Sequence, residues 1–395
     1  METIVEALWL PIVILFTCLI TYRVGKNLRL NYRLSLTLYC WHSFFCLFYY
    51  YFSLTNIADA SGYYRVALLG HYDWTPGTRF VESFTTVFVS GLGFGKLNTF
   101  LVFNVFGVIS LLLLANVLLT FWPYLRGRKK YIPYLILLLP GISFWSSAIG
   151  KDSIAFFAAC LATYAAIEIK NRKGLFFAAI IVMSLVRPHV GFFMLVAAFF
   201  ALLMDKRIGV FVRFAAISFV VVLLVFSYGY VTKYVGIGEV SPEAIGDYVE
   251  KRQGYNLSGG GAVDMSSLPL PLKVFTYLFR PLFFDAPGVF GLAASVENLF
   301  LLSLFLGFFL RGMPGFLLNK NFSTRYNFVF FLVGLAAFSL ITANLGISVR
   351  QKTMILPAMF FLIAFSAQRI YLIKNKKRTR IQVLQTCICL KNKEC

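Results

Sequence analysis

An arginine, a proline and a histidine lie together between two strongly apolar segments, where an ionised side chain is energetically costly. Residues 184–191 read SLVRPHVG, and the segments on both sides of them are strongly apolar. Charged groups at membrane depth are rare and usually functional, and solvation alone explains an Arg-Pro-His turn between two short apolar helices poorly. Arg187 and His189 are therefore candidates for a binding or catalytic role.

Other ionisable or amide side chains stand at similar breaks between apolar segments, or just inside one. WSSAIGKDS, FRPLFFDAP and NLGISVRQK are three such breaks. The further candidates are Asp59, Arg65, Lys151, Asp152, Arg280, Asp285, Glu297, Arg350, Gln351 and Lys352. Solvated turns account equally well for Lys151–Asp152 and for Arg350–Lys352, and Asp152 also fits the cap of a following helix.

Arginine and carboxylate side chains at this depth suit one kind of chemistry. Guanidinium groups bind phosphate through two parallel hydrogen bonds and stay charged at any working pH. Fixed cations stabilise a departing diphosphate, and a carboxylate can take the proton from an accepting hydroxyl. The histidines lack HxH, HExxH or DxD spacing, so the sequence predicts no metal site and no cofactor.

The composition requires these residues to be positioned by helices in a lipid bilayer. The chain has 395 residues, of which 59% are hydrophobic and only 13% are charged, so it cannot bury its apolar surface as a soluble protein. A spanning helix needs about 20 apolar residues, and such stretches recur. We predict an all-α polytopic membrane protein of about eleven spans: 4–22, 34–54, 98–122, 131–149, 153–169, 174–186, 190–204, 208–230, 292–310, 326–343 and 353–372.

The formal charge of +21 is explained by membrane topology and not by nucleic acid. With these spans, one side of the membrane holds 25 Lys and Arg against three acids, and the other holds 12 against 13. Positively charged loops stay cytoplasmic, which predicts an external N-terminus and a cytoplasmic C-terminus. The chain then has one transmembrane domain, 1–373, and a basic tail, 374–395. Two long external segments, 55–97 and 231–291, belong to the domain.

The turn motifs resemble those of bacterial polysaccharide repeat-unit polymerases, the Wzy-like proteins of O-antigen and capsule synthesis. The motifs are FWSSAIGKDS, SLVRPH, YLFRPLFFDAP followed by ENLF, and ANLGISVRQKTMILP, within residues 55–370. The resemblance implies an enzyme of the bacterial inner membrane, active on the periplasmic face. Its substrate would be an undecaprenyl-diphosphate-linked oligosaccharide, and a chain-length regulator is a candidate partner beside the bilayer itself.

The resemblance also suggests kinship with multi-span transferases of lipid-linked sugars, in which an acidic residue of the first outer loop is often catalytic. Asp59, in ADASGYY, fits that position, but the loop lacks the acidic pairs of metal-dependent members. The base stays open between Asp59 and Asp152, with His189 orienting a phosphate or hydroxyl. The expected diphosphate-binding residues are Lys151, Arg187, Arg280, Arg350 and Lys352, supported by Arg65, Asp285, Glu297 and Gln351.

Three alternatives stay open. A single-transfer glycosyltransferase or an O-antigen ligase would use the same lipid class and the same residues. A flippase or transporter of lipid-linked sugars would need charged residues at mid-depth, whereas most charges lie at span ends. A purely structural partner of a synthase complex would not need clustered arginines.

Overall fold

The computed structural model describes residues 2–122, 127–204, 268–286, 288–319 and 321–392, together with scattered residues between 205 and 267. The described chain is helical, and its β-pairing consists of an isolated antiparallel bridge between Ala262 and Asn344. The predicted span 208–230 and the part of the second long segment before residue 268 lie almost wholly outside the described residues.

Most of the longer described helices overlap apolar segments expected from the sequence. They are α1 (Glu2–Asn27), α2 (Tyr32–Thr55), α3 (Asp59–Ala67), α4 (Thr78–Thr86), α5 (Lys96–Phe121), α6 (Ile132–Leu137), α7 (Pro140–Ser146), α8 (Lys151–Ile167), α9 (Ile169–Val186), α10 (Pro188–Leu203), α13 (Leu270–Phe279), α14 (Gly288–Leu304), α15 (Leu310–Leu318), α16 (Phe322–Ile341), α17 (Leu345–Gln351) and α18 (Leu356–Asn392). Short π or 3-10 turns join some of them: η1 (Val87–Gly91), η2 (Gly127–Tyr131), η3 (Phe305–Phe309) and η4 (Lys352–Met354).

Five described helical segments are long and apolar enough to cross a membrane, which indicates a multi-pass membrane protein. They are Ala7–Asn27, Lys96–Phe121, Gly288–Leu318, Phe322–Ile341 and Leu356–Lys376. The larger number of spans predicted from the sequence includes shorter helices such as α8 and α10. In place of the predicted span 131–149, the chain is broken into α6 and α7. Pro140 begins α7 and lacks the amide hydrogen needed to continue α6.

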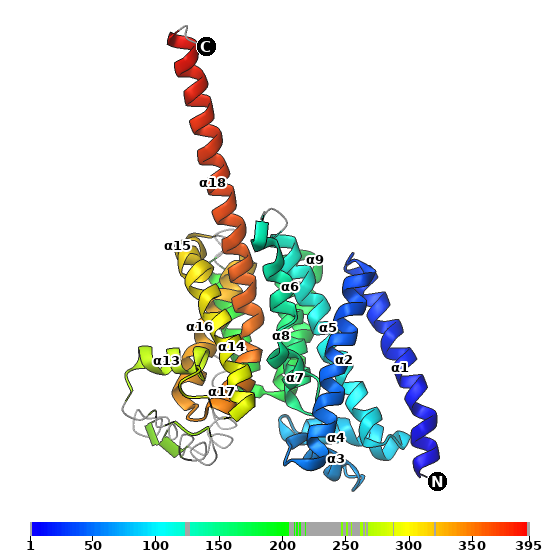
Figure 1. Ribbon diagram of the computed structural model, residues 1–395. Coiled ribbons are helices and arrows are strands. Elements are labelled where there is room, and N and C mark those ends of the chain that lie inside the picture. Colours follow the sequence, from blue (N-terminus) through cyan, green and yellow to red (C-terminus); the bar gives the residue numbers. More distant parts are fainter. Residues whose placement is uncertain are drawn as a thin grey trace.

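The bundle has two distinct ends (Figure 1). At one end lie α3, α4, α17 and the beginning of α1, and we call this the loop end. At the other lie the α1–α2 turn, α15 and the long projection of α18, and we call this the basic end. The predicted domain boundary at residue 373 falls inside α18, which continues to Asn392.

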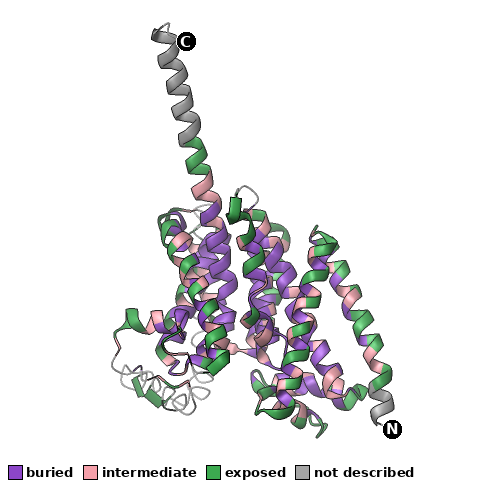
Figure 2. Cartoon of the chain, viewed as in Figure 1, coloured by how far each residue is buried: buried purple, intermediate pink, exposed green. Residues whose placement is uncertain are grey.

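Buried residues concentrate in the central helices α5, α8, α16 and the first part of α18 (Figure 2). On α8 small side chains form the contact face, and Ala155, Ala158, Ala162 and Ala165 are fully buried. Small residues let helix backbones approach closely in a membrane bundle. By contrast, α1 exposes Leu8, Leu15 and most of its other apolar side chains, as expected for a helix that faces lipid.

A buried polar contact fixes α7 against α2 and α5. His42 Nδ1 lies 2.5 Å from Asn104 Oδ1, and His42 Nε2 lies 3.0 Å from Ser146 Oγ. All three residues are buried, and the Ser146 hydroxyl also donates to the Ile142 carbonyl. Because buried polar groups are costly without partners, this contact holds the end of α7 in place.

Candidate functional site

The first long segment folds over the loop end as the helices α3 and α4. Gly77 precedes α4 with a φ of +106°, a backbone conformation that glycine adopts at little cost. Its amide donates to the Leu185 carbonyl at 2.8 Å, which fastens the start of α4 to the end of α9. Thr78 and Glu82 of α4 are thereby brought close to Arg187, which follows α9.

A second glycine places the first residues of α8. Gly150 has a φ of +150°, and a Cβ there would lie 3.4 Å from the Tyr63 ring of α3. This close turn is followed at once by Lys151 and Asp152 in the first turn of α8. The partial positive charge of a helix N-terminus favours the ionised carboxylate of Asp152.

Arg187 occupies the break between α9 and α10. Its backbone is non-helical (φ −140°, ψ 80°), its amide donates to the Met183 carbonyl at 2.6 Å, and Pro188 begins the next helix. The side chain is only 12% exposed, and its buried Nε has no hydrogen-bond partner among the described residues. A buried guanidinium with an unused donor is well suited to an anionic ligand.

Arg350 is presented by the short helix α17. Asn344 caps this helix, its side chain accepting hydrogen bonds from the amides of Gly346 and Ile347 at 2.9 and 3.3 Å. The second long segment adds support, because the Leu345 amide donates to the Gly261 carbonyl at 2.7 Å. The Arg350 guanidinium lies 5.8 Å from the ring centroid of Trp145, which places a cation over the aromatic face.

These elements join four side chains in one network, which we call the ion-pair network: Asp59, Asp152, Arg187 and Arg350. Arg187 donates to one oxygen of Asp152 at 2.5 Å, and Arg350 donates to the other. Arg350 also donates to Asp59 at 2.5 Å. Asp152 is buried, whereas the Asp59 side chain is 59% exposed. The four residues come from regions of the chain up to 291 positions apart.

An open pocket of about 520 Å³ lies against this network, and we call it the loop-end pocket. Its walls hold both acidic and basic side chains, and its lining is partly apolar. The lining residues are Asp59, Gly62, Tyr63, Val66, Thr78, Glu82, Lys151, Arg187, Ile347, Arg350 and Gln351. The pocket therefore offers three cations and a half-exposed carboxylate to a ligand.

The local electrostatics favour the ionised form of Asp152 in the network but disfavour the charged form of Lys151. Burial opposes the ionisation of Asp152, but attraction to Arg350 and Arg187 outweighs it and lowers the pKa of this carboxyl. Burial, reinforced by repulsion from Arg187, lowers the pKa of Lys151 to about 8. Its ammonium donates to the Thr78 hydroxyl at 2.6 Å. Lys151 is therefore a cation that can lose its charge near neutral pH.

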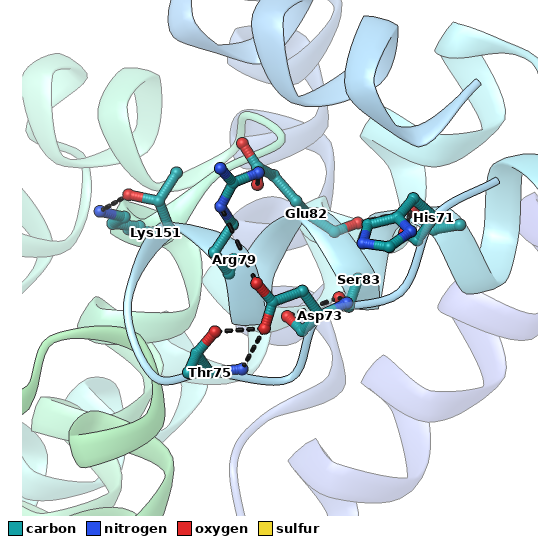
Figure 3. Close-up of polar contacts among 9 residues, drawn as sticks. His71, Asp73, Thr75, Arg79, Glu82, Ser83 and Lys151 are labelled. Carbon is teal, nitrogen blue, oxygen red and sulfur yellow. Dashed lines mark hydrogen bonds and ion pairs between the residues drawn. The ribbon is translucent and has the colours of Figure 1, made fainter. Parts of the chain in front are cut away.

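A second polar group on α4 and the loop before it includes the pocket residue Glu82, and we call this group and the neighbouring aromatic side chains the rim (Figure 3). Arg79 lies between Asp73 and Glu82, 4.0 and 3.4 Å from their carboxylates, and Figure 3 shows Lys151 at the start of α4. The loop before α4 also exposes Tyr72 and Trp74, whose rings stack with centroids 6.2 Å apart. The rim thus combines charged groups with two exposed aromatic faces.

Lys352 lies outside the pocket despite its place two residues after Arg350. It is 3% exposed, and its ammonium donates to the Asn298 side chain and to the Leu278 carbonyl at 3.3 Å. Glu297 attracts it electrostatically and accepts a hydrogen bond from the Gly141 amide at 2.6 Å. Glu297 is therefore held by the backbone amide that donates to it and lies within the electrostatic influence of Lys352.

Four of the remaining predicted residues, Arg280, Asp285, His189 and Arg65, are not among the pocket-lining residues. Arg280 and Asp285 pair locally at 2.5 Å, beside the turn that Asn298 holds through the Pro281 carbonyl. His189 packs against the rings of Phe193 and Phe338, each 6.2 Å away. Arg65 is exposed on α3 and is not part of the pocket wall. Gln351 does line the pocket and accepts a hydrogen bond from Thr342 at 3.2 Å.

Tyr63, Thr78 and Glu82 also line the pocket. Sequence reasoning missed Thr78 altogether and considered Tyr63 and Glu82 only as polar or aromatic residues of the first external segment. Tyr63 and Glu82 follow Asp59 in the same external segment, so proximity along the chain was the available signal. Thr78 carries no charge, and its position depends on the contact between Gly77 and Leu185. That contact joins residues far apart in the sequence and leaves no local pattern.

Comparisons with protein-family models, curated proteins and solved structures found no match to this chain. Within the described part of the chain, no three His, Cys, Asp or Glu side chains are grouped so that they could hold a metal ion. The function is therefore inferred from the residues and geometry of the site.

Proposed function

We propose that this chain is a membrane glycosyltransferase that polymerises oligosaccharide repeat units carried on undecaprenyl diphosphate. The observation that carries the proposal is the ion-pair network at the wall of an open pocket, at the end of the bundle opposite the basic connections. A lipid-linked diphosphate has its phosphates at the bilayer surface and its sugars in water, which matches the depth of such a pocket. The loop end is then the periplasmic face.

In this proposal Arg187, Arg350 and Lys151 bind the diphosphate of the donor. Arginine forks match phosphate oxygens, and both Arg187 and Arg350 line the pocket. As the bond between the anomeric carbon and the diphosphate oxygen breaks, the leaving diphosphate takes the electron pair. Cations already held in place by Asp152 stabilise that charge without reorganisation.

The general base in the proposal is Asp59 rather than Asp152. Asp152 is buried, and both of its oxygens are engaged by arginines, so it acts by positioning them. Asp59 faces the pocket with a half-exposed carboxylate held by a single arginine. It accepts the proton of the acceptor hydroxyl as that oxygen attacks the anomeric carbon. The sequence left this choice open, and the difference in burial favours Asp59.

The rim supplies a place for the sugars of the donor or acceptor. Trp74 and Tyr72 are 50% and 45% exposed, and their faces are available for stacking on sugar rings. Asp73, Arg79 and Glu82 supply hydrogen-bonding groups beside them. A platform of this kind accommodates a repeating polymer because stacking tolerates variation in sugar identity.

The gel profile of surface polysaccharide from source cells lacking this gene tests the proposal. A ladder that collapses to one repeat unit on its anchor is expected, because units would still be made, flipped and attached. Loss of every repeat, including the single unit, would contradict polymerisation and would favour a flippase, a ligase or an earlier transferase.

A further inference from the structure

Two pockets lie at the basic end, on either side of the α1–α2 turn. One, of about 670 Å³, is bounded by the turn, the end of α5 and α6. The other, of about 650 Å³, lies between α1 and α2. Both are lined by Arg29 and Leu30, so the turn separates two neighbouring pockets. Neither shares a residue with the loop-end pocket.

Both pockets combine apolar walls with cations. Their lining has more apolar than polar character, with Leu34 and Leu137 in one pocket and Leu36 in the other. The cations are Lys26, Arg29 and Arg33, and no acidic residue lines either pocket. Within the described part of the chain, none of these three cations forms an ion pair. A site of this character selects a ligand with an anionic head and apolar chains.

The turn that presents these cations is held in a defined shape. Arg29 has a φ of +56°, and the Leu28 carbonyl before it accepts a hydrogen bond from the Asn116 side chain of α5 at 2.9 Å. Asn31 caps α2 by accepting from the Arg33 amide at 2.9 Å. Side chains on such a turn lose less freedom on binding than those on a flexible linker.

We propose that the α1–α2 turn binds an anionic phospholipid of the inner leaflet. The phosphate lies at Arg29, which both pockets share, and the two acyl chains lie one in each pocket. Lys26 and Arg33 flank the head group from the two sides. A free phosphate would use the cations but would leave the apolar walls empty. This site is independent of the reaction proposed for the loop end.

Thermal unfolding of the full-length chain in detergent tests the site, because a ligand that binds the folded state raises the unfolding midpoint. Dioleoylphosphatidylglycerol, dioleoylphosphatidylcholine and sodium phosphate are titrated separately. We expect phosphatidylglycerol to raise the midpoint most. Arg29→Gln should need about fivefold more of this lipid for the same shift, because a cation near anionic lipid contributes about 1 kcal/mol. Lys173→Gln removes an exposed cation outside both pockets and should behave as wild type.

Three results would overturn the inference. They are an equal shift with phosphatidylcholine, a shift with sodium phosphate as large as with phosphatidylglycerol, and an unchanged titration in Arg29→Gln. If Arg29→Gln does not fold, the double variant Lys26→Gln/Arg33→Gln takes its place, because neither residue has positive φ. A wild-type titration curve in that double variant would also contradict the site.

Discussion

Arg350 and Lys352 are two positions apart, yet they belong to different environments. Arg350 lines the loop-end pocket, touches two carboxylates and is 25% exposed at its side chain. Lys352 points into the bundle, where Asn298 and the Leu278 carbonyl accept its hydrogen bonds. The chain turns from α17 into η4 between them. Two cations in one motif can therefore have different roles: Arg350 lines the pocket, whereas Lys352 holds neighbouring helices together.

The same contrast separates two arginine–aspartate pairs. Arg350–Asp59 and Arg280–Asp285 have the same 2.5 Å separation. The first pair joins α17 to α3 beside a pocket, whereas the second closes a local turn between residues only five positions apart. A local pair can form wherever the chain bends, but a pair of distant residues requires the whole fold. The distant pair is the stronger indicator of a site.

The largest effect is expected from Lys352→Ala, and it should fall on stability. Removing this ammonium leaves Glu297 and the acceptor atoms around it buried without their cation, which costs about 3–5 kcal/mol. Fluorescence-detected size exclusion in detergent would show loss of folded protein. Lys352→Met with Glu297→Gln removes both charges and should restore part of the yield. If Lys352→Ala instead gave a normal yield of folded protein and no polymer, Lys352 would act on activity as Arg350 does, and the proposed difference between the two residues would be wrong.

The next effect is expected from Arg350→Lys, and it should fall on activity. Lysine keeps the charge but loses the fork that reaches Asp59 and Asp152 together. We expect polymer formation in cells to fall by about 10²–10³, the usual cost of one lost donor to a developing anion. Arg280→Lys is the matched control and should lose far less. Equal losses of polymer in both variants would contradict a specific role of the loop-end pocket in the reaction.

A smaller effect is expected from pH, through Lys151. Because its pKa is lowered to about 8, the ammonium is present below pH 8 and lost above it. One fewer charged donor should weaken substrate binding about tenfold, so the apparent KM should rise between pH 7 and 9. Lys151→Arg keeps its charge throughout and should flatten this rise. If the apparent KM of Lys151→Arg rose in the same way between pH 7 and 9, the pH dependence would come from a group other than Lys151.

The smallest effect is expected at the rim. Trp74→Ala removes one of two stacked and exposed rings, and an aromatic contact contributes about 1 kcal/mol. We expect about fivefold weaker use of long acceptors and a shift of the polymer profile to shorter chains, with normal folding. Phe284→Ala removes an aromatic side chain that is 79% exposed elsewhere and should leave the profile unchanged.

Much of the helical architecture was predictable because lipid imposes length and hydropathy on each helix. The break between α9 and α10 falls at Arg187, as the SLVRPHVG stretch indicates. Pro188 begins a helix and the residue before a proline avoids the helical conformation, so local chemistry sets this break. The split into α6 and α7 was missed, although Pro140 was visible within the apolar run.

The membership of the site was predictable only in part. Apolar flanks identify Asp152, Arg187 and Arg350 as charged residues at helix ends, and the structure joins them. Hydropathy does not say which way a side chain points around its helix, so the sequence did not show that Lys352 and His189 lie outside the pocket lining. That direction is decided by packing between helices, which one sequence does not reveal.

The most direct test of the central claim uses the purified chain in lipid nanodiscs with undecaprenyl-diphosphate-linked repeat units. We expect a ladder of products from wild type and from Asp285→Asn. Asp59→Asn should form polymer about 10²–10⁴ times more slowly, because it cannot accept the acceptor proton. Asp59→Asn protein that is folded and still forms the wild-type ladder at the wild-type rate would contradict the account.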